Sequence, residues 1–192
     1  MPVVAALWLA GCAASTPELA YTCPTAGFIP DGDRLAVFRN MANPDPEAIM
    51  VRAELLNFRY VCKPVPRKGV MEVDMTLTFM ADRLEGDMKA LSLPYFVAVL
   101  DENENIVERQ RHNIRLTFGK NEVKVKDGLP DTRAMAAAQH TVAVAVIAPT
   151  KADKHRVVFG FELTPAQVRF NRGEDIAPPP ATPVAEKTKR KK

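Results

Sequence analysis

The chain has 192 residues, enough for one domain with a tail, and 47% of them are hydrophobic and 26% charged. These proportions exclude a wholly disordered chain, a collagen-like chain and a membrane protein with several spans. The net charge of +3 comes from residues 177–192, which hold five basic residues and one acidic residue. The remainder has 21 basic and 22 acidic residues, so no nucleic-acid partner is predicted.

An apolar run, Val3–Ala10, lies close to the start of the chain. It is too short to span a bilayer, which takes about twenty apolar residues, but it has the length of the apolar centre of a signal peptide. The run ends in Leu9-Ala10-Gly11-Cys12. These four residues resemble the lipobox of bacterial lipoproteins.

The lipobox resemblance implies cleavage after Gly11, a diacylglyceryl thioether on the Cys12 sulfur and acylation of the new amino terminus. Several acyl chains anchor a protein firmly, since each buried methylene contributes about 0.8 kcal/mol. Met1–Val3 has no Lys or Arg, so the true start of the signal peptide is predicted to lie upstream. Ala13 replaces the Asp that retains such lipoproteins in the inner membrane, which implies the periplasmic face of the outer membrane. The alternative is a buried amino-terminal strand with a core cysteine.

The other two cysteines, Cys23 and Cys62, predict a disulfide, because thiols in the periplasm are kept oxidised. A bridge would close a loop of about 40 residues and contribute roughly 4 kcal/mol on the chain-entropy model. Two separate buried thiols are the alternative. With no CxxC motif and no third thiol, no metal site is predicted.

Most of the chain after residue 23 has the pattern of strands. Met71–Ala81 alternates apolar and polar residues, which predicts a strand with one buried face. Glu47–Cys62 loses its alternation near Leu55, and this predicts a bulge. Tyr95–Leu100 is continuously apolar, and it forms a predicted hairpin with Ile106–Phe118.

Further strands are predicted at Arg34–Phe38, at Thr141–Ala148 and at Arg156–Leu163, the last two pairing around a loop at Pro149. The Ala-rich segment Thr132–His140 predicts a turn of helix. About eight strands without long helices favour an all-β fold, an antiparallel β-sandwich of immunoglobulin-like type.

One short carboxy-terminal helix is predicted from Pro165 to about Asn171, because Thr164 and Gln167 form a capping box around Pro165. Residues 173–192 are Pro-rich and then basic, and are predicted to be disordered. The predicted organisation is thus a signal peptide (1–11), a lipidated tether (12–22), a β-sandwich (23–172) and a tail (173–192).

The chain from about Cys12 to Arg172 resembles proteobacterial outer-membrane lipoproteins of unassigned function. The resemblance is carried by a short segment and the Asn-Arg pair that follows it. These residues are Gly160, Phe161, Leu163, Thr164, Gln167, Asn171 and Arg172. The resemblance implies a compartment and a fold, and no activity.

No catalytic motif or cofactor site is predicted. His112, His140 and His155 are interpreted as satisfied or solvated, and His112 is expected at the edge of a buried face because it shares the parity of that face. Asp101, Asn103 and Asn105 have the spacing that opens a calcium loop. The loop lacks its Gly and its bidentate Glu, so a hairpin turn is predicted instead.

Two sets of charged residues are expected on exposed strand faces. Glu72 and Asp74 form one set; the other consists of Arg109, Arg111 and Arg115. If the strands are neighbours, the sets make cross-strand ion pairs, which is the preferred interpretation. If they are not, the arginines form a stripe for an anionic partner such as lipid A phosphate.

The basic end of the tail, Lys189, Arg190, Lys191 and Lys192, has three interpretations. It could contact anionic membrane or cell-wall polymer. Its terminal lysine could be joined to peptidoglycan, as in the murein lipoprotein, which Lys192 resembles only in ending with lysine. It could also simply increase solubility.

Together these features predict a non-enzymatic, lipid-anchored envelope protein that acts as a binding, scaffold or accessory subunit. Its partners would be the membrane, through the acyl anchor, and an unidentified envelope protein or cell-wall polymer. The alternative is a small-ligand or metal-binding envelope protein that uses loops at one end of the sandwich.

Overall fold

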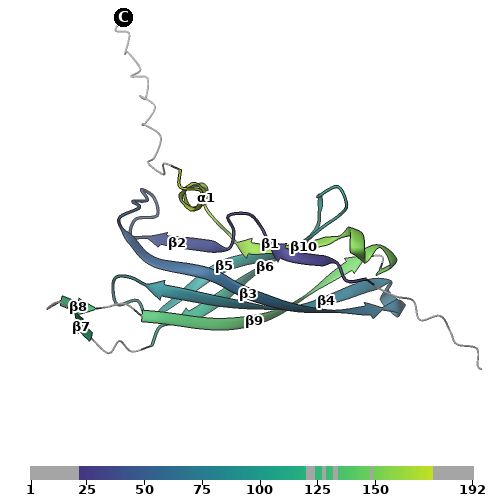
Figure 1. Ribbon diagram of the computed structural model, residues 1–192, viewed down its shortest axis with the longest axis horizontal. Coiled ribbons are helices and arrows are strands. Elements are labelled where there is room, and N and C mark those ends of the chain that lie inside the picture. The colour runs from purple at the N-terminus through teal and green to yellow at the C-terminus, as the bar shows by residue number, and fades with distance from the viewer. Residues whose placement is uncertain (1–21, 120–123, 127–128, 132–133, 148, 175–192) are drawn as a thin grey trace, which may run out of the picture.

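The computed structural model describes residues 22–119, 124–126, 129–131, 134–147 and 149–174. They form a β-sandwich of two four-stranded sheets (Figure 1). The predicted signal peptide, Cys12 and the basic residues of the tail lie outside these ranges. No helix of the described residues is long and apolar enough to cross a bilayer.

The predicted all-β sandwich with one short carboxy-terminal helix is confirmed. Sheet A consists, in spatial order, of β1 (Thr25–Phe28), β10 (Arg156–Phe161), β5 (Ala90–Leu100) and β6 (Ile106–Thr117). Sheet B consists of β2 (Arg34–Phe38), β3 (Ile49–Val65), β4 (Val70–Arg83) and β9 (Ala134–Ile147). The smaller elements are the ribbon of β7 (Lys124–Lys126) and β8 (Leu129–Asp131), the 3-10 turns η1 (Pro66–Lys68) and η2 (Pro149–Lys154), and helix α1 (Pro165–Asn171). β1 pairs with β10 in parallel, and every other described pairing is antiparallel.

Strand β4 confirms the alternation read from the sequence. Its odd-numbered side chains from Met71 to Ala81 are at most 1% exposed, and they form the centre of the core between the sheets. Tyr95 of β5 and Phe159 of β10 meet them from sheet A, both fully buried.

The predicted bulge in β3 lies between Leu55 and Asn57. Before it the odd-numbered side chains face the core, whereas after it the even-numbered Phe58 and Cys62 do. This change of phase turns Cys62 toward Cys23, and the predicted disulfide joins the two, with Cα atoms 5.8 Å apart. The bridge ties β3 of sheet B to the segment that leads into β1 of sheet A.

The helical turn predicted at Thr132–His140 is wrong. The described part of this segment belongs to β9, which pairs with β4 from Ala134 opposite Arg83 to Ile147 opposite Val70. Alanine favours helices in isolation, but here pairing along the full length of β4 decides the conformation.

The predicted pairing of Thr141–Ala148 with Arg156–Leu163 is also wrong. β9 lies in sheet B and β10 in sheet A, with η2 between them. β10 is an inner strand between β1 and β5, which explains why Val157–Phe161 is buried on both faces.

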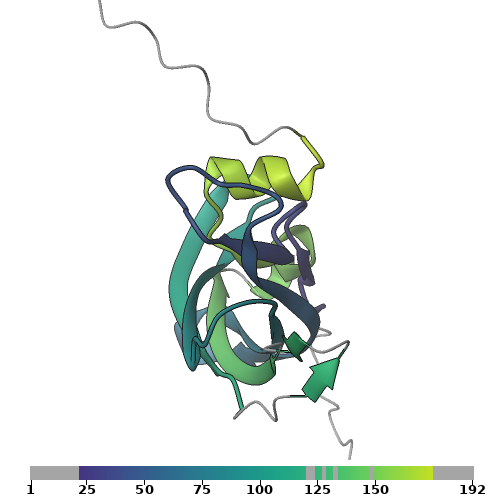
Figure 2. The same ribbon diagram turned by 90° about the vertical axis from the view of Figure 1, so that its left-hand side faces the viewer.

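The predicted capping box is present at Thr164, and α1 lies at the edge of the sandwich beside β2 (Figure 2). The side-chain amide of Gln167, which is buried, donates to the Ala36 carbonyl at 2.7 Å. Asn171 donates to the Asp31 and Arg34 carbonyls at 2.7 and 2.8 Å. These bonds fix the helix against β2 and the loop before it.

Candidate functional site: a groove on the outer face of sheet A

The outer face of sheet A is apolar at its centre, where a solvent-facing strand would ordinarily carry polar side chains. Three outward-facing residues of β5, Phe96, Ala98 and Leu100, are at most 9% exposed. Val158 of β10 joins them in a hydrophobic cluster separate from the main core. Sheet A therefore has apolar side chains on both faces.

The segment between β1 and β2 covers part of this outer face. The Ile29 amide donates to the Phe159 carbonyl at 3.0 Å, and the Phe161 amide donates to the Gly32 carbonyl at 2.8 Å. A Cβ on Gly160 would lie 2.6 Å from Cγ2 of Ile29, so only glycine lets the segment approach β10 this closely. Ile29 consequently rests on the outer apolar cluster and forms a wall beside it.

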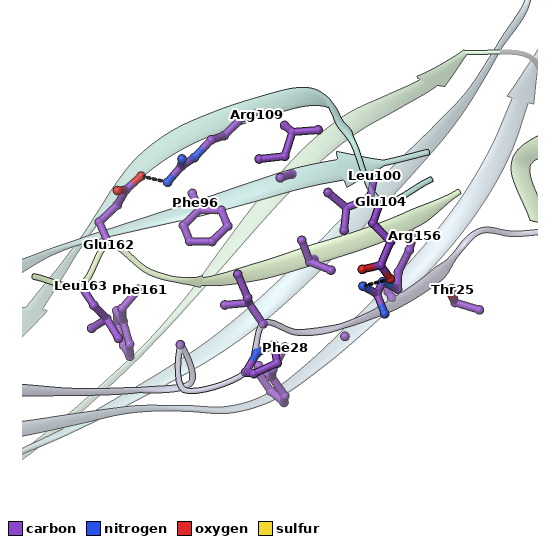
Figure 3. Close-up of a pocket in the computed structure, with 18 of the residues that line it drawn as sticks. Thr25, Phe28, Phe96, Leu100, Glu104, Arg109, Arg156, Phe161, Glu162 and Leu163 are labelled. Carbon is purple, nitrogen blue, oxygen red and sulfur yellow. Dashed lines mark hydrogen bonds and ion pairs between the residues drawn. The ribbon is translucent and has the colours of Figure 1, made fainter. Parts of the chain in front are cut away.

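A groove of about 740 Å³ lies between this wall and β6 (Figure 3). Phe96, Ala98 and Leu100 lie along its base, and Phe28 lies on the β1 side. Ile106 of β6 borders the groove and is 59% exposed. A concave, mainly apolar surface of this size is typical of binding sites.

Ion pairs lie at two places on the border of the groove. At one, the Arg109 guanidinium lies 4.4 Å from the centre of the Phe96 ring and donates to Glu162 at 2.8 Å. At the other, Arg156 donates to Glu104 at 2.9 Å. Figure 3 shows both pairs, with Phe96 beside the first.

The two places differ in net charge. Arg111 donates through Nε to the same Glu162 oxygen that Arg109 uses, so two guanidinium groups share one carboxylate. Arg115 lies further along the same outer face of β6, and in the described part of the chain it makes no hydrogen bond or ion pair. Arg109 and Arg111 with one carboxylate carry a net charge of +1 at the first place, and Arg115 adds a further positive charge along β6, whereas the Arg156–Glu104 pair is neutral.

The preferred interpretation of these arginines, ion pairing with Glu72 and Asp74, is wrong. The two acids lie on β4 in sheet B, whose neighbours are β3 and β9, and Arg109, Arg111 and Arg115 lie on β6 in sheet A. Asp74 instead pairs with Lys63 at 2.6 Å, and this hydrogen bond raises the pKa of Lys63. The arginines therefore form the exposed stripe that was the alternative.

A polar cluster lies inside the sandwich where β6 faces β9. The Tyr95 hydroxyl is hydrogen-bonded to Nδ1 of His140, and the ring of His112 stacks on Tyr95 with centres 5.2 Å apart. Nε2 of His112 is buried and has no hydrogen-bond partner in the described structure. Burial, followed by the neighbouring His140, lowers the pKa of His112.

His112 thus lies at the edge of the buried face, as its parity predicted, but among the described residues its buried Nε2 finds no hydrogen-bond partner, contrary to the expectation of a satisfied or solvated ring. Burial also raises the pKa of the Tyr95 hydroxyl. His155 lies just after η2 and is not part of this cluster.

The predicted hairpin turn at Asp101 is confirmed. Its carboxylate accepts the backbone amides of Asn103 and Asn105, both at 2.9 Å, and these bonds, chiefly that from Asn105, lower its pKa. Asp101, the first residue with calcium-loop spacing, therefore uses its carboxylate to close the turn between β5 and β6. Within the described ranges, no three His, Cys, Asp or Glu residues are grouped so that they could hold a metal ion.

Sequence reasoning located the arginine stripe but not the groove beside it. One signal was present, since the unbroken apolar run Tyr95–Leu100 indicates burial on both faces of a strand. What covers the second face depends on the contact of Gly32 with Gly160, two glycines 128 positions apart that have no distinguishing pattern.

Comparison with protein families, with curated proteins and with solved structures finds no match to this chain. The resemblance to outer-membrane lipoproteins therefore stays a prediction, carried by the lipobox and by the segment from Gly160 to Arg172.

Proposed function

We propose that the chain is a lipid-anchored, non-enzymatic protein at the periplasmic face of the outer membrane, acting as a binding, scaffold or accessory subunit. The groove on the outer face of sheet A is the binding surface in this proposal. The lipobox at Cys12 supports the anchor, and the Cys23–Cys62 bridge is in keeping with an oxidising compartment.

The observation that carries the proposal is an apolar groove bordered by charge. The outer cluster of Phe96, Ala98 and Leu100 does not contribute to the core between the sheets, which lies on the other side of β5. Apolar surface next to a cluster of arginines is a common composition of recognition sites, where apolar contact gives affinity and charge gives orientation.

The position of the anchor supports use of this groove near a membrane. Nine residues, 13–21, lie between Cys12 and Thr22, where the described part of the chain begins, and an extended chain covers at most about 3.5 Å per residue. An acylated Cys12 would therefore hold Thr22, three residues before β1, within about 35 Å of the lipid surface. Phe28 of β1 borders the groove.

The size of the groove favours the second candidate, a small-ligand-binding envelope protein. Its volume of about 740 Å³ lies within the usual range of ligand sites, about 300–1,000 Å³. The groove lies on the face of a sheet, so this candidate no longer depends on loops at one end of the sandwich.

Site-specific photocrosslinking in the native envelope tests the proposal. A photoreactive residue at Ile106, which borders the groove, is expected to give an adduct, whereas one at the next position, Val107, is not. Val107 is 53% exposed and does not border the groove, so it controls for exposure. The adduct mass distinguishes a protein partner from a small ligand. Equal or absent labelling at both positions would contradict the assignment of the groove.

Mass spectrometry of the chain purified from the envelope tests the anchor. Acyl mass on a peptide that begins at Cys12 is expected, together with a bridged Cys23–Cys62 peptide pair. An unmodified Cys12 would remove the lipid anchor from the proposal.

A further inference from the structure

We propose that the groove binds a medium-chain fatty acid, with its acyl chain on the apolar base and its carboxylate at the arginine stripe of Arg109, Arg111 and Arg115. The inference rests on the proposed function, because it names the ligand class of the same groove.

The apolar base has the shape that a single extended chain needs. Phe96, Ala98 and Leu100 are alternate residues on one face of β5, so they lie in a row about 13 Å long at roughly 3.3 Å per residue. Ile29 lies against this row from one side, and Ile106 borders the groove on the β6 side. Phe96, Ala98 and Leu100 are themselves at most 9% exposed, so the apolar surface that an acyl chain would remove from water is chiefly that of Ile106 and Phe28, which border the groove and are 59% and 36% exposed.

The arginine stripe supplies unused hydrogen-bond donors for a carboxylate. Arg111 is bonded to Glu162 only through Nε, and its side chain is 74% exposed. Its two terminal nitrogens, and all those of Arg115, have no hydrogen-bond partner in the described structure. Glu162 shows that a carboxylate fits this place, since it accepts from Arg109 and Arg111 together. Arginine and carboxylate form strong, charge-assisted hydrogen bonds.

The charge difference along the border sets the direction of the ligand. The arginine stripe together with Glu162 has a net charge of +2, while the Arg156–Glu104 pair near Leu100 is neutral. The carboxylate is therefore attracted to the Arg111 end, and the methyl end of the chain points toward Leu100.

Two other occupants fit these observations less well. A stable protein partner covers about 800 Å² of each surface, far more than a short groove on one sheet face offers. The chain's own tail, residues 177–192, has five basic residues and one acidic residue, so the arginine stripe repels it.

Ligand titration tests the proposal on the full 192-residue chain with its disulfide intact. Cys12→Ser prevents acylation, so that no attached chain competes with the added one. The probes are dodecanoate, its neutral analogue dodecanol and the shorter hexanoate, each below its aggregation limit. One dodecanoate is expected per protein, with dodecanol and hexanoate at least about tenfold weaker, because one lacks the charge and the other half of the chain.

Two pairs of matched variants connect the binding to the groove. Ile106→Glu places a carboxylate at the border of the groove and is expected to weaken dodecanoate binding at least about tenfold. Val107→Glu makes the same charge change at the next position, which does not border the groove, and is expected to leave dodecanoate binding unchanged. Arg111→Gln is expected to weaken dodecanoate but not dodecanol. Arg59→Gln, an exposed arginine on β3 of sheet B, affects neither.

The outcomes separate this inference from the proposed function. Absence of dodecanoate binding, equal binding of dodecanol, or equal effects of Ile106→Glu and Val107→Glu would overturn it. If the Ile106 crosslink then captures a protein, or if the chain binds only vesicles of anionic phospholipid, the groove remains a binding surface for another ligand. Lack of any adduct at Ile106 would overturn the proposed function itself.

Discussion

Strands β4 and β5 are both central strands, but they bury their side chains differently. In β4, every second residue from Met71 to Ala81 faces the core, and the residues between them are partly exposed. In β5, all residues from Tyr95 to Leu100 are buried, because the segment at Ile29 covers the outer face as well. The core of this sandwich is thus set by ordinary alternation, and the groove on its outer face by β5 and β10, whose apolar runs are buried on both faces.

The largest expected effect compares a side chain on the core face of β4 with one on the outer face of β5. Phe79→Ala removes a fully buried ring that packs on Tyr95 at 4.9 Å between centres, and it is expected to cost about 3–5 kcal/mol of the free energy of unfolding. Phe96→Ala is expected to cost about 2 kcal/mol, because water in the groove can occupy the space. Urea denaturation of both variants measures the difference. Equal losses would mean that the outer cluster is as closed as the core.

The disulfide is the next largest contribution, and it acts chiefly by restricting the unfolded chain. It closes a loop between residues 39 apart, so replacing both cysteines by Ser is expected to lower the free energy of unfolding by about 2–4 kcal/mol. The comparison uses urea denaturation of the oxidised protein and the double variant. If the double variant matches the oxidised protein, the bridge does not restrict the unfolded chain.

The core between the sheets and the outer face of sheet A also differ in how much of their structure the sequence alone predicts. The alternation of β4, the bulge at Leu55 and the capping box at Thr164 depend on neighbouring residues, and all three were predicted correctly. The conformation of Ala134–His140 depends on pairing with β4, and local composition therefore predicted it wrongly. The exposed arginine stripe could be located by parity, but its partner Glu162 is 53 residues from Arg109 in the chain.

Gly160→Ala tests the close approach that shapes the groove. A Cβ there would meet Cγ2 of Ile29 at 2.6 Å and the Gly32 carbonyl oxygen at 3.0 Å, so a loss of about 1–3 kcal/mol in the free energy of unfolding is expected. Gly119→Ala is the matched control, since a Cβ at Gly119 has no atom within 4 Å and Gly119 does not border the groove. Both variants are compared by urea denaturation and by dodecanoate titration. Equal behaviour would show that the segment at Ile29 can move away from β10.

The smallest expected effect comes from the polar cluster between β6 and β9, and it depends on pH. Burial lowers the pKa of His112 below its ordinary value of 6.5, so around and below pH 6.5 the unfolded chain binds more protons than the folded protein. The contribution of neutral His112 to the free energy of unfolding is therefore fully present above pH 6.5 and is lost as pH falls from there through the lowered pKa.

His112→Phe keeps an aromatic ring on Tyr95 without a titrating nitrogen, and it is expected to reduce the slope of stability against pH between about 5 and 6.5. Urea midpoints measured across this range for both proteins give the slopes. An unchanged slope would show that His112 is protonated as easily in the folded protein as in the unfolded chain.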